Sequence, residues 1–336
     1  MTNDYKFEFR PYQRRFLRSL TTNHGRWDIR EGIILHLTDE SGKVGWGEIA
    51  PISWFGSETL EQALDFCRQL PREITDEMIF SIPDELPACQ FGFESAWEWG
   101  SGKWGNEFFS MPHAPCPMPH AQSFSGLLPA GEAALNQWEA LWQQGYRTFK
   151  WKIGVDAIAH ELKIFESLIH TLPAFTKLRL DANGGLTYEE ANLWLWTCDN
   201  LKANPELPLE IEFIEQPLPV EQFQQMLELS TSYETAIALD ESVATLGQLA
   251  ACYQQGWRGI FVIKPGIVGS PSRLRKFCHQ HQIDTVFSSV FETAIARLAA
   301  LQLAAELSRN NRAIGFGIDH FFEQEETWLQ SLWNDL

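Results

Sequence analysis

The later two-thirds of the chain alternates between short apolar runs and longer stretches with helical spacing. The strand-like runs lie at 122–128, 148–153, 177–180, 211–214, 235–239, 259–263, 284–288 and 313–318. Helical patterns lie between them at 131–144, 158–170, 187–197, 220–229, 245–253 and 294–308. Strands that alternate with helices form parallel βα units, and eight such strands form a closed barrel. The pattern therefore predicts an α/β barrel.

Charged residues mark the ends of several of these strand-like runs. Five of them follow one another along the chain: Lys152, Asp181, Glu215, Asp240 and Lys264. Positions 152, 181, 215, 240 and 264 are separated by 29, 34, 25 and 24 residues, which is about one βα unit each time. The carboxyl ends of barrel strands form the face on which barrel active sites are built. We therefore expect these side chains to meet in one site.

The three carboxylates of this set indicate a metal site. Asp181, Glu215 and Asp240 would repel one another in a single cleft and retain protons unless a cation neutralised them. Oxygen ligands without His or Cys favour Mg²⁺, with Mn²⁺ as the alternative, and leave coordination positions for water and a substrate carboxylate. These three residues are the predicted metal ligands.

The lysines indicate proton transfer next to a carboxylate. Lys152 can act as a base only when neutral, and Lys150 on the same strand face, about 6 to 7 Å away, lowers its pKa. Lys150 is predicted to contact the substrate. Lys264 lies four strands further around the barrel, so it approaches the substrate from the other side. A proton α to a carboxylate suits this set, because a divalent ion on the acid's oxygens stabilises the enediolate.

Each of these residues also has a structural interpretation. A single lysine or carboxylate at a strand end is usually solvated or caps a helix, and only the ordered series makes a joint site the better hypothesis. Ser288 and Ser289 either cap the following helix or face the site, and Ser289 is the predicted substrate contact. Glu48 is expected in a salt bridge of the N-terminal part, or in shaping a lid beside a mobile loop at Gly47.

The N-terminal part has a different organisation. Runs at 33–37 and 44–49 flank a turn at 39–42 and predict a hairpin. A helix is expected from Ser57, its predicted N-cap, and another over 89–99. The Pro-rich passage 111–119 is the candidate linker. We expect one domain over 1–112, a barrel domain over 113–320, and a C-terminal segment, 321–336, that packs back on the first domain.

Composition excludes several classes of partner. The chain has 336 residues, with 44 acidic against 26 basic side chains and a formal charge of −18, which disfavours nucleic acid and anionic membranes. No long apolar stretch and no signal-peptide pattern occurs at the N-terminus. The six cysteines lack metal-site spacing and are expected to be reduced. We expect a cytoplasmic protein, with a monomer favoured, acting on a small-molecule carboxylate.

The motifs together resemble the enolase superfamily, in its muconate-lactonising subgroup, and most closely the o-succinylbenzoate synthases. They cover nearly the whole chain: 45–51 (GWGEIAP), 150–152 (KWK), 181–183 (DAN), 215–217 (EQP), 240–242 (DES) and 264–265 (KP). The resemblance implies a modified TIM barrel, (β/α)7β, with an α+β capping domain completed by the C-terminal segment. It also implies that Lys152 removes the α-proton and that Lys264 stabilises the enediolate from the other face.

The resemblance implies a metal-dependent hydro-lyase of menaquinone or phylloquinone biosynthesis. The reaction would be the syn-dehydration of 2-succinyl-6-hydroxy-2,4-cyclohexadiene-1-carboxylate to 2-succinylbenzoate. Residues 315–319 lack the Asp-x-Asp pair of dipeptide epimerases, which favours the synthase. An N-succinylamino acid racemase or another epimerase is the alternative, since two lysines on opposite faces suit a 1,1-proton transfer. A non-catalytic binding barrel is a further alternative.

Overall fold

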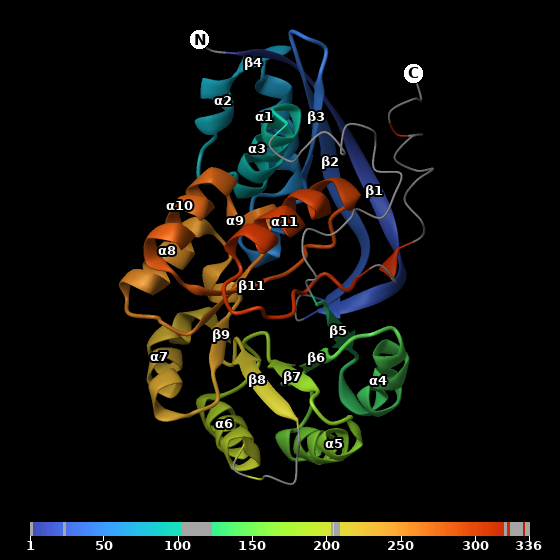
Figure 1. The fold of residues 1–336 in the computed structure, drawn as a ribbon, viewed down its shortest axis with the longest axis vertical. Coiled ribbons are helices and arrows are strands. Elements are labelled where there is room, and N and C mark those ends of the chain that lie inside the picture. The colour runs from blue at the N-terminus through green and yellow to red at the C-terminus, as the bar shows by residue number, and fades with distance from the viewer. Residues whose placement is uncertain are drawn as a thin grey trace.

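Two sheets organise the molecule (Figure 1). The structure, a computed structural model, describes residues 3–22, 25–102, 123–202, 204, 209–318, 321–322 and 332. A four-stranded sheet is built from the N-terminal part in the order β3-β2-β1-β4, and a seven-stranded sheet follows in the order β11-β10-β9-β8-β7-β6-β5. The first sheet lies against the face of the second at which the strands end, and the candidate site lies between them.

The N-terminal sheet is antiparallel. Its strands are β1 (Asp4–Thr22), β2 (Gly25–Asp39), β3 (Val44–Ile49) and β4 (Glu73–Thr75). The β2–β3 hairpin confirms the predicted one, with Leu37 opposite Gly45. The long strand β1 was not expected, although its start carries the alternation that marks a half-buried strand, with Tyr5, Phe7 and Phe9 between charged residues.

Helices cover one face of this sheet. They are η1 (Ser53–Phe55), α1 (Leu60–Gln69), α2 (Asp76–Phe80) and α3 (Pro87–Gly100). The N-cap prediction for α1 was wrong by two residues. Thr59, not Ser57, forms a capping box with Gln62, which satisfies two main-chain donors at once. The Ser57 hydroxyl instead accepts from the main-chain nitrogen of Ile52 at 2.7 Å.

Helix α3 approaches β3 so closely that only glycine fits at the contact. A Cβ atom on Gly47 would lie 2.1 Å from the carbonyl oxygen of Gly92, and one on Gly45 would lie 2.0 Å from that of Ala96. The prediction of a mobile loop at Gly47 was therefore wrong. The glycines of this motif allow a helix to pack on a strand backbone, which a sequence pattern does not distinguish from a loop.

The second sheet is parallel and curls into a barrel. Its strands are β5 (Ser125–Leu128), β6 (Thr148–Lys152), β7 (Lys177–Asp181), β8 (Glu210–Glu215), β9 (Ile237–Leu239), β10 (Ile260–Ile263) and β11 (Asp284–Phe287). Isolated bridges join Ile314 to Phe124 and Gly315 to Ser288. These two bridges take the place of the eighth strand expected at 313–318 and join the two edges of the sheet. The (β/α)7β prediction is confirmed in this form.

Helices surround the barrel strands. They are η3 (Gly131–Ala133), α4 (Ala134–Gln143), α5 (Ile158–Thr171), α6 (Tyr188–Lys202), η4 (Val220–Gln222), α7 (Phe223–Ser232), η5 (Glu241–Val243), α8 (Leu246–Gln254), α9 (Pro265–Val268), α10 (Pro271–His281) and α11 (Ala294–Leu307). The sequence interpretation missed α10. Its start signal was available, since Ser270 caps the helix and Pro271 occupies the first turn.

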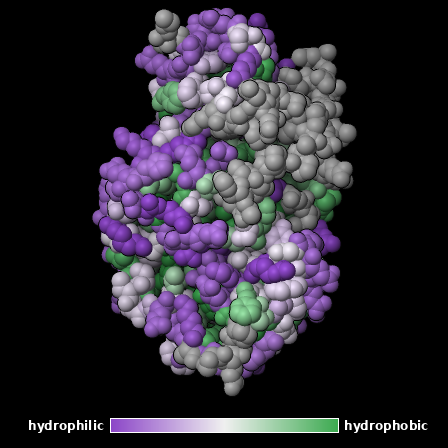
Figure 2. Space-filling view, viewed as in Figure 1, coloured by the Kyte–Doolittle hydropathy of each residue, from purple (hydrophilic) through white to green (hydrophobic). Residues whose placement is uncertain are grey.

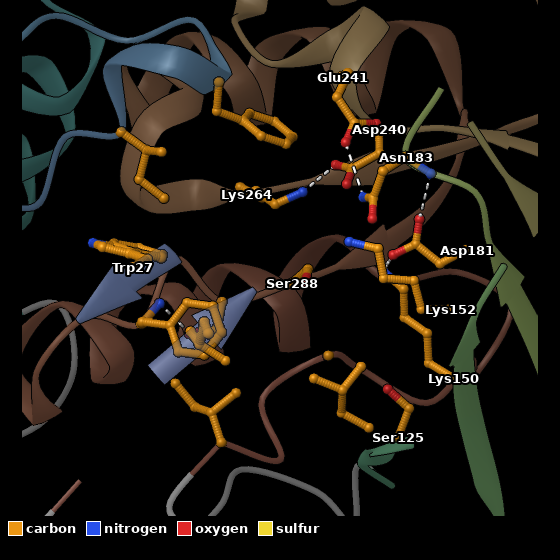
Figure 3. A pocket seen from close by; sticks show the side chains of 18 of the residues that line it. Trp27, Ser125, Lys150, Lys152, Asp181, Asn183, Asp240, Glu241, Lys264 and Ser288 are labelled. Carbon is orange, nitrogen blue, oxygen red and sulfur yellow. Dashed lines mark hydrogen bonds and ion pairs between the residues drawn. The ribbon is translucent and has the colours of Figure 1, made fainter. Parts of the chain in front are cut away.

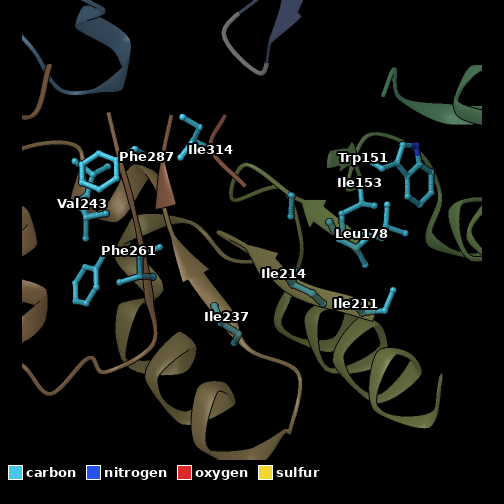
Figure 4. Close-up of a cluster of buried hydrophobic side chains, with 14 of the residues drawn as sticks. Trp151, Ile153, Leu178, Ile211, Ile214, Ile237, Val243, Phe261, Phe287 and Ile314 are labelled. Atoms are coloured by element: carbon cyan, nitrogen blue, oxygen red, sulfur yellow. The ribbon is translucent and has the colours of Figure 1, made fainter. Parts of the chain in front are cut away.

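Side-chain alternation divides the barrel into two apolar regions. Side chains such as Trp151, Leu178 and Ile214 point outward to the helices and form the largest core cluster (Figure 4). Phe213 and Val262 point inward and belong to a smaller interior cluster. Because side chains alternate along a strand, the residues at 150, 152 and 181 share the interior face with this smaller cluster. The outward prediction for Trp151 is confirmed.

On the coloured part of the face shown in Figure 2, hydrophilic residues predominate, with apolar residues in small groups between them. Within the described residues, no helix is both long enough and apolar enough to cross a bilayer. The predicted domain boundary at 112/113 and most of 321–336 lie outside the described residues. Of the latter segment, Phe322 stacks on Phe16 of β1 with ring centroids 4.7 Å apart.

Candidate active site

A cavity of about 280 Å³ lies between the carboxyl ends of the barrel strands and the N-terminal sheet. Its barrel side is mainly polar and includes Lys150, Lys152, Asp181, Asp240, Lys264 and Ser289. Its other side is apolar and comes from the N-terminal part, with Leu20, Ile52 and the rings of Trp27, Trp54 and Phe55. One half of the cavity therefore suits charge chemistry and the other half suits an apolar ring.

The strand register brings the predicted residues to one level. Lys152 pairs with Asp181 on the next strand, and Asp181 pairs with Glu215 on the one after. Asp240 directly follows β9 and Lys264 directly follows β10. Parallel strands that end together place their last side chains at the same rim. Five of the seven predicted residues lie at this rim, Lys150 lies one step below it, and Ser289 lies two residues beyond the end of β11 at the cavity wall.

Lys150 is paired with two of the carboxylates. Its ammonium lies 2.7 Å from Oδ2 of Asp181 and 2.7 Å from Oε1 of Glu215. Both carboxylates are buried, and Glu215 is not among the residues that line the cavity. Burial lowers the pKa of Lys150, but the neighbouring carboxylates more than offset it, so its pKa is raised and the ammonium stays charged.

Lys152 has a different environment from Lys150. Burial lowers the pKa of Lys152, and Asp181 opposes this effect while the Lys150 ammonium adds to it. The direction is the one predicted, but its main cause is burial rather than the neighbouring lysine. Figure 3 shows Lys152 reaching into the cavity from the side opposite Lys264. A lysine with a lowered pKa at the cavity wall has the properties of a general base.

Lys264 approaches from the other side of the cavity. Its ammonium forms an ion pair with Asp240 and lies 4.0 Å from the ring centroid of Phe55 in η1. The ring face is electron-rich, so this contact favours a cation at that place. An aromatic side chain of the N-terminal part thus contacts a predicted catalytic group of the barrel.

The carboxylates fit a hard divalent cation. Burial raises the pKa values of Asp181, Glu215 and Asp240, so each needs a nearby positive charge to stay ionised. Among the described residues, no group of three or more His, Cys, Asp or Glu side chains has the arrangement of a metal site. At the rim, the ammonium groups of Lys150 and Lys264 form ion pairs with these carboxylates. The donor set is all oxygen, as Mg²⁺ requires.

Two residues that sequence reasoning quoted without assigning a role belong to the same rim. Asn183 donates from Nδ2 to Oε1 of Glu241 at 3.0 Å, and its main-chain nitrogen donates to Asp181 at 3.1 Å. The other oxygen of Glu241, Oε2, is buried and has no hydrogen-bond partner. An unpartnered buried carboxylate oxygen next to three more carboxylates also fits a cation site.

The segment after β11 carries Ser288, Ser289 and Phe291 to the cavity wall. The Ser289 hydroxyl donates to Glu292 at 2.8 Å and accepts from the main-chain nitrogen of Phe291 at 2.9 Å. Phe291 has a φ of 60°, a conformation that bulky residues rarely adopt. Ser289 therefore stabilises the turn. Its hydroxyl has one lone pair left that can accept a hydrogen bond from a substrate.

The rings and apolar side chains from the N-terminal part were not predicted as site residues. No periodic signal marks Trp27, Trp54 or Phe55, because aromatic residues are common in cores and their convergence depends on how the sheet docks. Glu48 was expected in a salt bridge, and that prediction was wrong. Its buried carboxylate accepts from the Tyr12 hydroxyl at 2.5 Å and from the main chain at the start of α11.

Family models match both parts of the chain. Residues 133–331 match the family described as "Enolase C-terminal domain-like", and residues 12–98 match "MenC, N-terminal domain". An o-succinylbenzoate synthase from Thermosynechococcus vestitus is 41% identical over 94% of this chain and 93% of its own length. The o-succinylbenzoate synthase of Bacillus subtilis is 27% identical over 82% of this chain and 75% of its own.

Solved structures agree with the family models. An o-succinylbenzoate synthase from Thermosynechococcus elongatus BP-1, complexed with Mg in its active site, has a TM-score of 0.85 and 38% identity, covering 98% of this chain and 100% of its own. The L-Ala-D/L-Glu epimerase of Bacillus subtilis has a TM-score of 0.73 at 21% identity, covering 95% of this chain and 90% of its own, and shows the shared fold alone. The chain belongs to the o-succinylbenzoate synthase family of the enolase superfamily.

Proposed function

We propose that this protein is an o-succinylbenzoate synthase, a metal-dependent lyase that removes water from 2-succinyl-6-hydroxy-2,4-cyclohexadiene-1-carboxylate to give 2-succinylbenzoate, a step of menaquinone or phylloquinone biosynthesis. Family membership supports the activity. The observation that carries the residue roles is the position of Lys152 and Lys264 on opposite sides of one cavity, above three buried carboxylates. Proton removal next to a carboxylate needs such an arrangement.

Asp181, Glu215 and Asp240 would hold Mg²⁺, with Mn²⁺ as the alternative. When bound, the ion would act as a Lewis acid on the developing charge of the substrate carboxylate. Lys150 lies 2.7 Å from two of these carboxylates. Its role in the proposal is to hold one charged ammonium near the substrate carboxylate, because its raised pKa keeps it protonated at neutral pH.

Lys152 is the proposed base. Its neutral amine takes the proton from the carbon next to the ring carboxylate, and the resulting ammonium returns that proton to the departing hydroxyl on the same face. Burial favours the neutral amine that the first step needs. The Lys264 side chain, which forms an ion pair with Asp240, lies on the other face and stabilises the negative charge of the enediolate without transferring a proton.

The cavity also fits the rest of the substrate. The diene ring is apolar, and Trp27, Phe55 and Phe291 supply apolar surface beside the lysines. Because its hydroxyl already donates to Glu292 at 2.8 Å, Ser289 keeps one lone pair, with which it can accept a hydrogen bond from the hydroxyl group of the substrate. The aromatic ring of the product is planar and packs well against the same aromatic side chains. These contacts therefore favour formation of the product.

The test is an ultraviolet assay for the aromatic product, with Lys152→Ala compared with Lys177→Ala. Lys177 starts β7 at the opposite end of the barrel and forms an exposed ion pair with Glu210 at 3.1 Å. We expect Mg²⁺-dependent turnover by the wild type and by Lys177→Ala, and none by Lys152→Ala or after EDTA treatment. Absence of turnover by folded, metal-loaded wild type would contradict the proposed activity.

The same protein should be offered N-succinylamino acids in D₂O. Two lysines on opposite faces also suit a 1,1-proton transfer, so α-deuteration without synthase activity would identify the racemase instead. Neither activity in metal-loaded protein would favour a binding barrel. We further propose that the enzyme acts in the cytoplasm as a monomer. The five cysteines among the described residues are free thiols, as is usual for proteins of a reducing compartment, which supports the first proposal, and light scattering on the purified protein tests the second.

A further inference from the structure

One arginine of the N-terminal sheet is buried and has no carboxylate partner among the residues that the structure describes. Arg30 in β2 is 2% exposed, and all the acceptors of its guanidinium are main-chain carbonyls. Within the described residues it takes part in no ion pair. A buried arginine normally pairs with a carboxylate, because the charge is expensive to remove from water. Here the buried charge is stabilised by neutral carbonyl groups instead. The segments to which these carbonyls belong therefore indicate what the arginine is for.

The first set of carbonyls belongs to the segment before η1. Nη1 of Arg30 donates to the carbonyl of Pro51 at 3.0 Å, and Nη2 donates to that of Ala50. This segment continues directly into Ile52, Trp54 and Phe55, which line the apolar side of the cavity. The planar guanidinium holds both carbonyls in one fixed geometry. Arg30 therefore fixes the start of the segment that brings Phe55 to Lys264.

The second contact crosses to the barrel. Nε of Arg30 donates to the carbonyl of Val290 at 3.0 Å, 260 positions further along the chain. Val290 lies between Ser289 and Phe291, which both line the cavity. Phe291 has its positive φ at this point, and such a conformation persists only where the surroundings impose it. Arg30 holds the carbonyl next to that strained residue.

The aromatic side chains around Arg30 complete the same wall. Its guanidinium carbon lies 5.6 Å from the centroid of the Trp27 ring. Trp27 packs edge-to-face against Phe291 at 5.6 Å and against Trp54 at 4.9 Å. One guanidinium thus contacts three of the parts of the chain that lead to the apolar surface of the cavity: strand β2, the segment before η1, and the segment after β11.

We propose that Arg30 is a positioning residue for the substrate, which sets the apolar wall of the cavity by holding residues 50–55 and 288–291 together. The expected effect on KM rests on the proposed function. The positioning role itself rests on the contacts of Arg30. Arg30 does not line the cavity, so it acts through Phe55, Phe291 and Ser289. Removing it should loosen the wall that binds the ring without removing the proton-transferring lysines.

The test compares Arg30→Met with Arg258→Met. Arg258 also donates to two main-chain carbonyls, at 2.7 Å each, and lies 3.9 Å from a tyrosine ring, but it precedes β10 at the other end of the barrel. We expect Arg30→Met to raise KM about tenfold or more while kcat changes much less, since binding of ground and transition states is lost together. Arg258→Met should leave both constants unchanged.

Hydrogen exchange gives a measurement that does not depend on turnover. Peptides covering 50–56 and 288–296 should exchange faster in Arg30→Met than in wild type, and peptides from α5 or α6 should not. Unchanged exchange in both peptides would overturn the inference even if activity fell. If wild type has no synthase activity, the proposed function fails, and the exchange data still decide the role of Arg30.

A double-mutant cycle separates positioning from general loss of stability. If Arg30 acts through Phe291, Arg30→Met should raise KM much less in a Phe291→Ala background than in wild type. Strictly additive effects would contradict the proposal. Arg30→Lys serves where Arg30→Met does not fold. A lysine keeps the charge but not the planar set of donors, so we expect an intermediate KM and faster exchange at 288–296, and wild-type values for both would also overturn the inference.

Discussion

The carboxylate of Glu48 accepts a hydrogen bond from the main-chain nitrogen of Thr293 at 3.0 Å, although the two residues are 245 positions apart. It also accepts from the main-chain nitrogen of Ala296 at 3.2 Å. Thr293 is the N-cap residue of α11 and Ala296 lies in its first turn, so a residue of the N-terminal sheet caps a barrel helix. Arg30 of the same sheet donates to the carbonyl of Val290. The N-terminal sheet therefore contacts the segment after β11 through one acidic and one basic side chain.

Glu48→Gln should destabilise the protein and loosen the start of α11. An amide keeps the shape of the carboxylate but offers one acceptor oxygen without charge, and hydrogen bonds to a charged group contribute about 1.5–3 kcal/mol each. We expect the free energy of unfolding, measured in urea, to fall by about that amount. Exchange of the amides of Thr293 and Ala296 should become faster.

Glu58→Gln is the matched control for this substitution. Glu58 is also buried and caps a helix, accepting from the main-chain nitrogens of Ala88 and Cys89 at 3.0 and 2.8 Å, but both partners lie within the N-terminal part. Its loss should weaken α3 and leave the amides of α11 unchanged. Equal exchange in α11 for both variants would contradict the role assigned to Glu48.

Gly47→Ala should be strongly destabilising. The added methyl group would lie 2.1 Å from the carbonyl oxygen of Gly92, so α3 must move away from β3, at a cost of about 1–3 kcal/mol or more. Gly247→Ala is the control, because its methyl group meets nothing closer than Thr245 Oγ1 at 3.9 Å within helix α8. We expect that change to stabilise by up to about 1 kcal/mol. Similar melting temperatures for both variants would refute the steric argument.

His36 should make stability fall at mildly acidic pH. It is 7% exposed, lies 3.2 Å from Glu8 through Nε2, and burial lowers its pKa from 6.5 to about 4. Unfolded His36 binds a proton below pH 6.5, whereas folded His36 does so only below about pH 4. Stability is therefore lost as pH falls through this window, by roughly 3 kcal/mol in full.

The measurement is the difference in unfolding free energy between wild type and His36→Gln at pH 7 and at pH 4. Glutamine does not titrate, so the variant should lose less stability than the wild type over this range. Parallel pH profiles would mean that His36 binds a proton as readily in the folded protein as in the unfolded one. The ring of Trp46, 5.1 Å from that of His36, should then change its fluorescence with pH, which gives an independent check.

The barrel and its charged rim could be predicted from sequence because both follow from local patterns. Asp181 and Glu215 end apolar runs, and parallel strands bring such ends together without further information. The position of the eighth strand could be predicted, but not its reduction to two isolated bridges. These bridges, at Ile314 and Gly315, depend on both edges of the sheet. Local signals determine strand ends, and barrel closure is a long-range event.

The apolar side of the cavity could not be predicted for the same reason. Phe55 reaches Lys264 because η1 follows a segment that Arg30 holds, and no spacing between positions 55 and 264 encodes this contact. The metal geometry is a third case. The strand-end pattern predicts three carboxylates. Which positive charge they bind depends on the positions of the side chains, and in this structure Lys150 lies between two of them.

The pH dependence of turnover should report the lowered pKa of Lys152. The base must be neutral, so kcat/KM should fall about tenfold per pH unit below that pKa, with a midpoint below the ordinary lysine value of 10.5. Lys152→Arg, which cannot lose its proton at these pH values, should be inactive at every pH. A rate that keeps rising to pH 10.5 would contradict burial as the cause of the shift.

Lys150→Met should show what neutralises the carboxylates. In the metal-free protein, removing the ammonium leaves Asp181 and Glu215 buried without their partner, at a cost of about 3–5 kcal/mol. Bound Mg²⁺ stabilises the folded state by RT ln(1 + [L]/Kd), and its charge replaces the one removed. We therefore expect the loss of unfolding free energy to be large in EDTA and much smaller in saturating Mg²⁺.

Lys177→Met is the control, since its exposed pair with Glu210 should contribute less than about 1 kcal/mol under either condition. The melting temperatures of wild type, Lys150→Met and Lys177→Met, each with EDTA and with Mg²⁺, give the comparison. An equal loss for Lys150→Met with and without the metal would mean that Mg²⁺ does not bind at these carboxylates. That result would count against Asp181 and Glu215 as metal ligands, because a cation held by them must offset the missing ammonium.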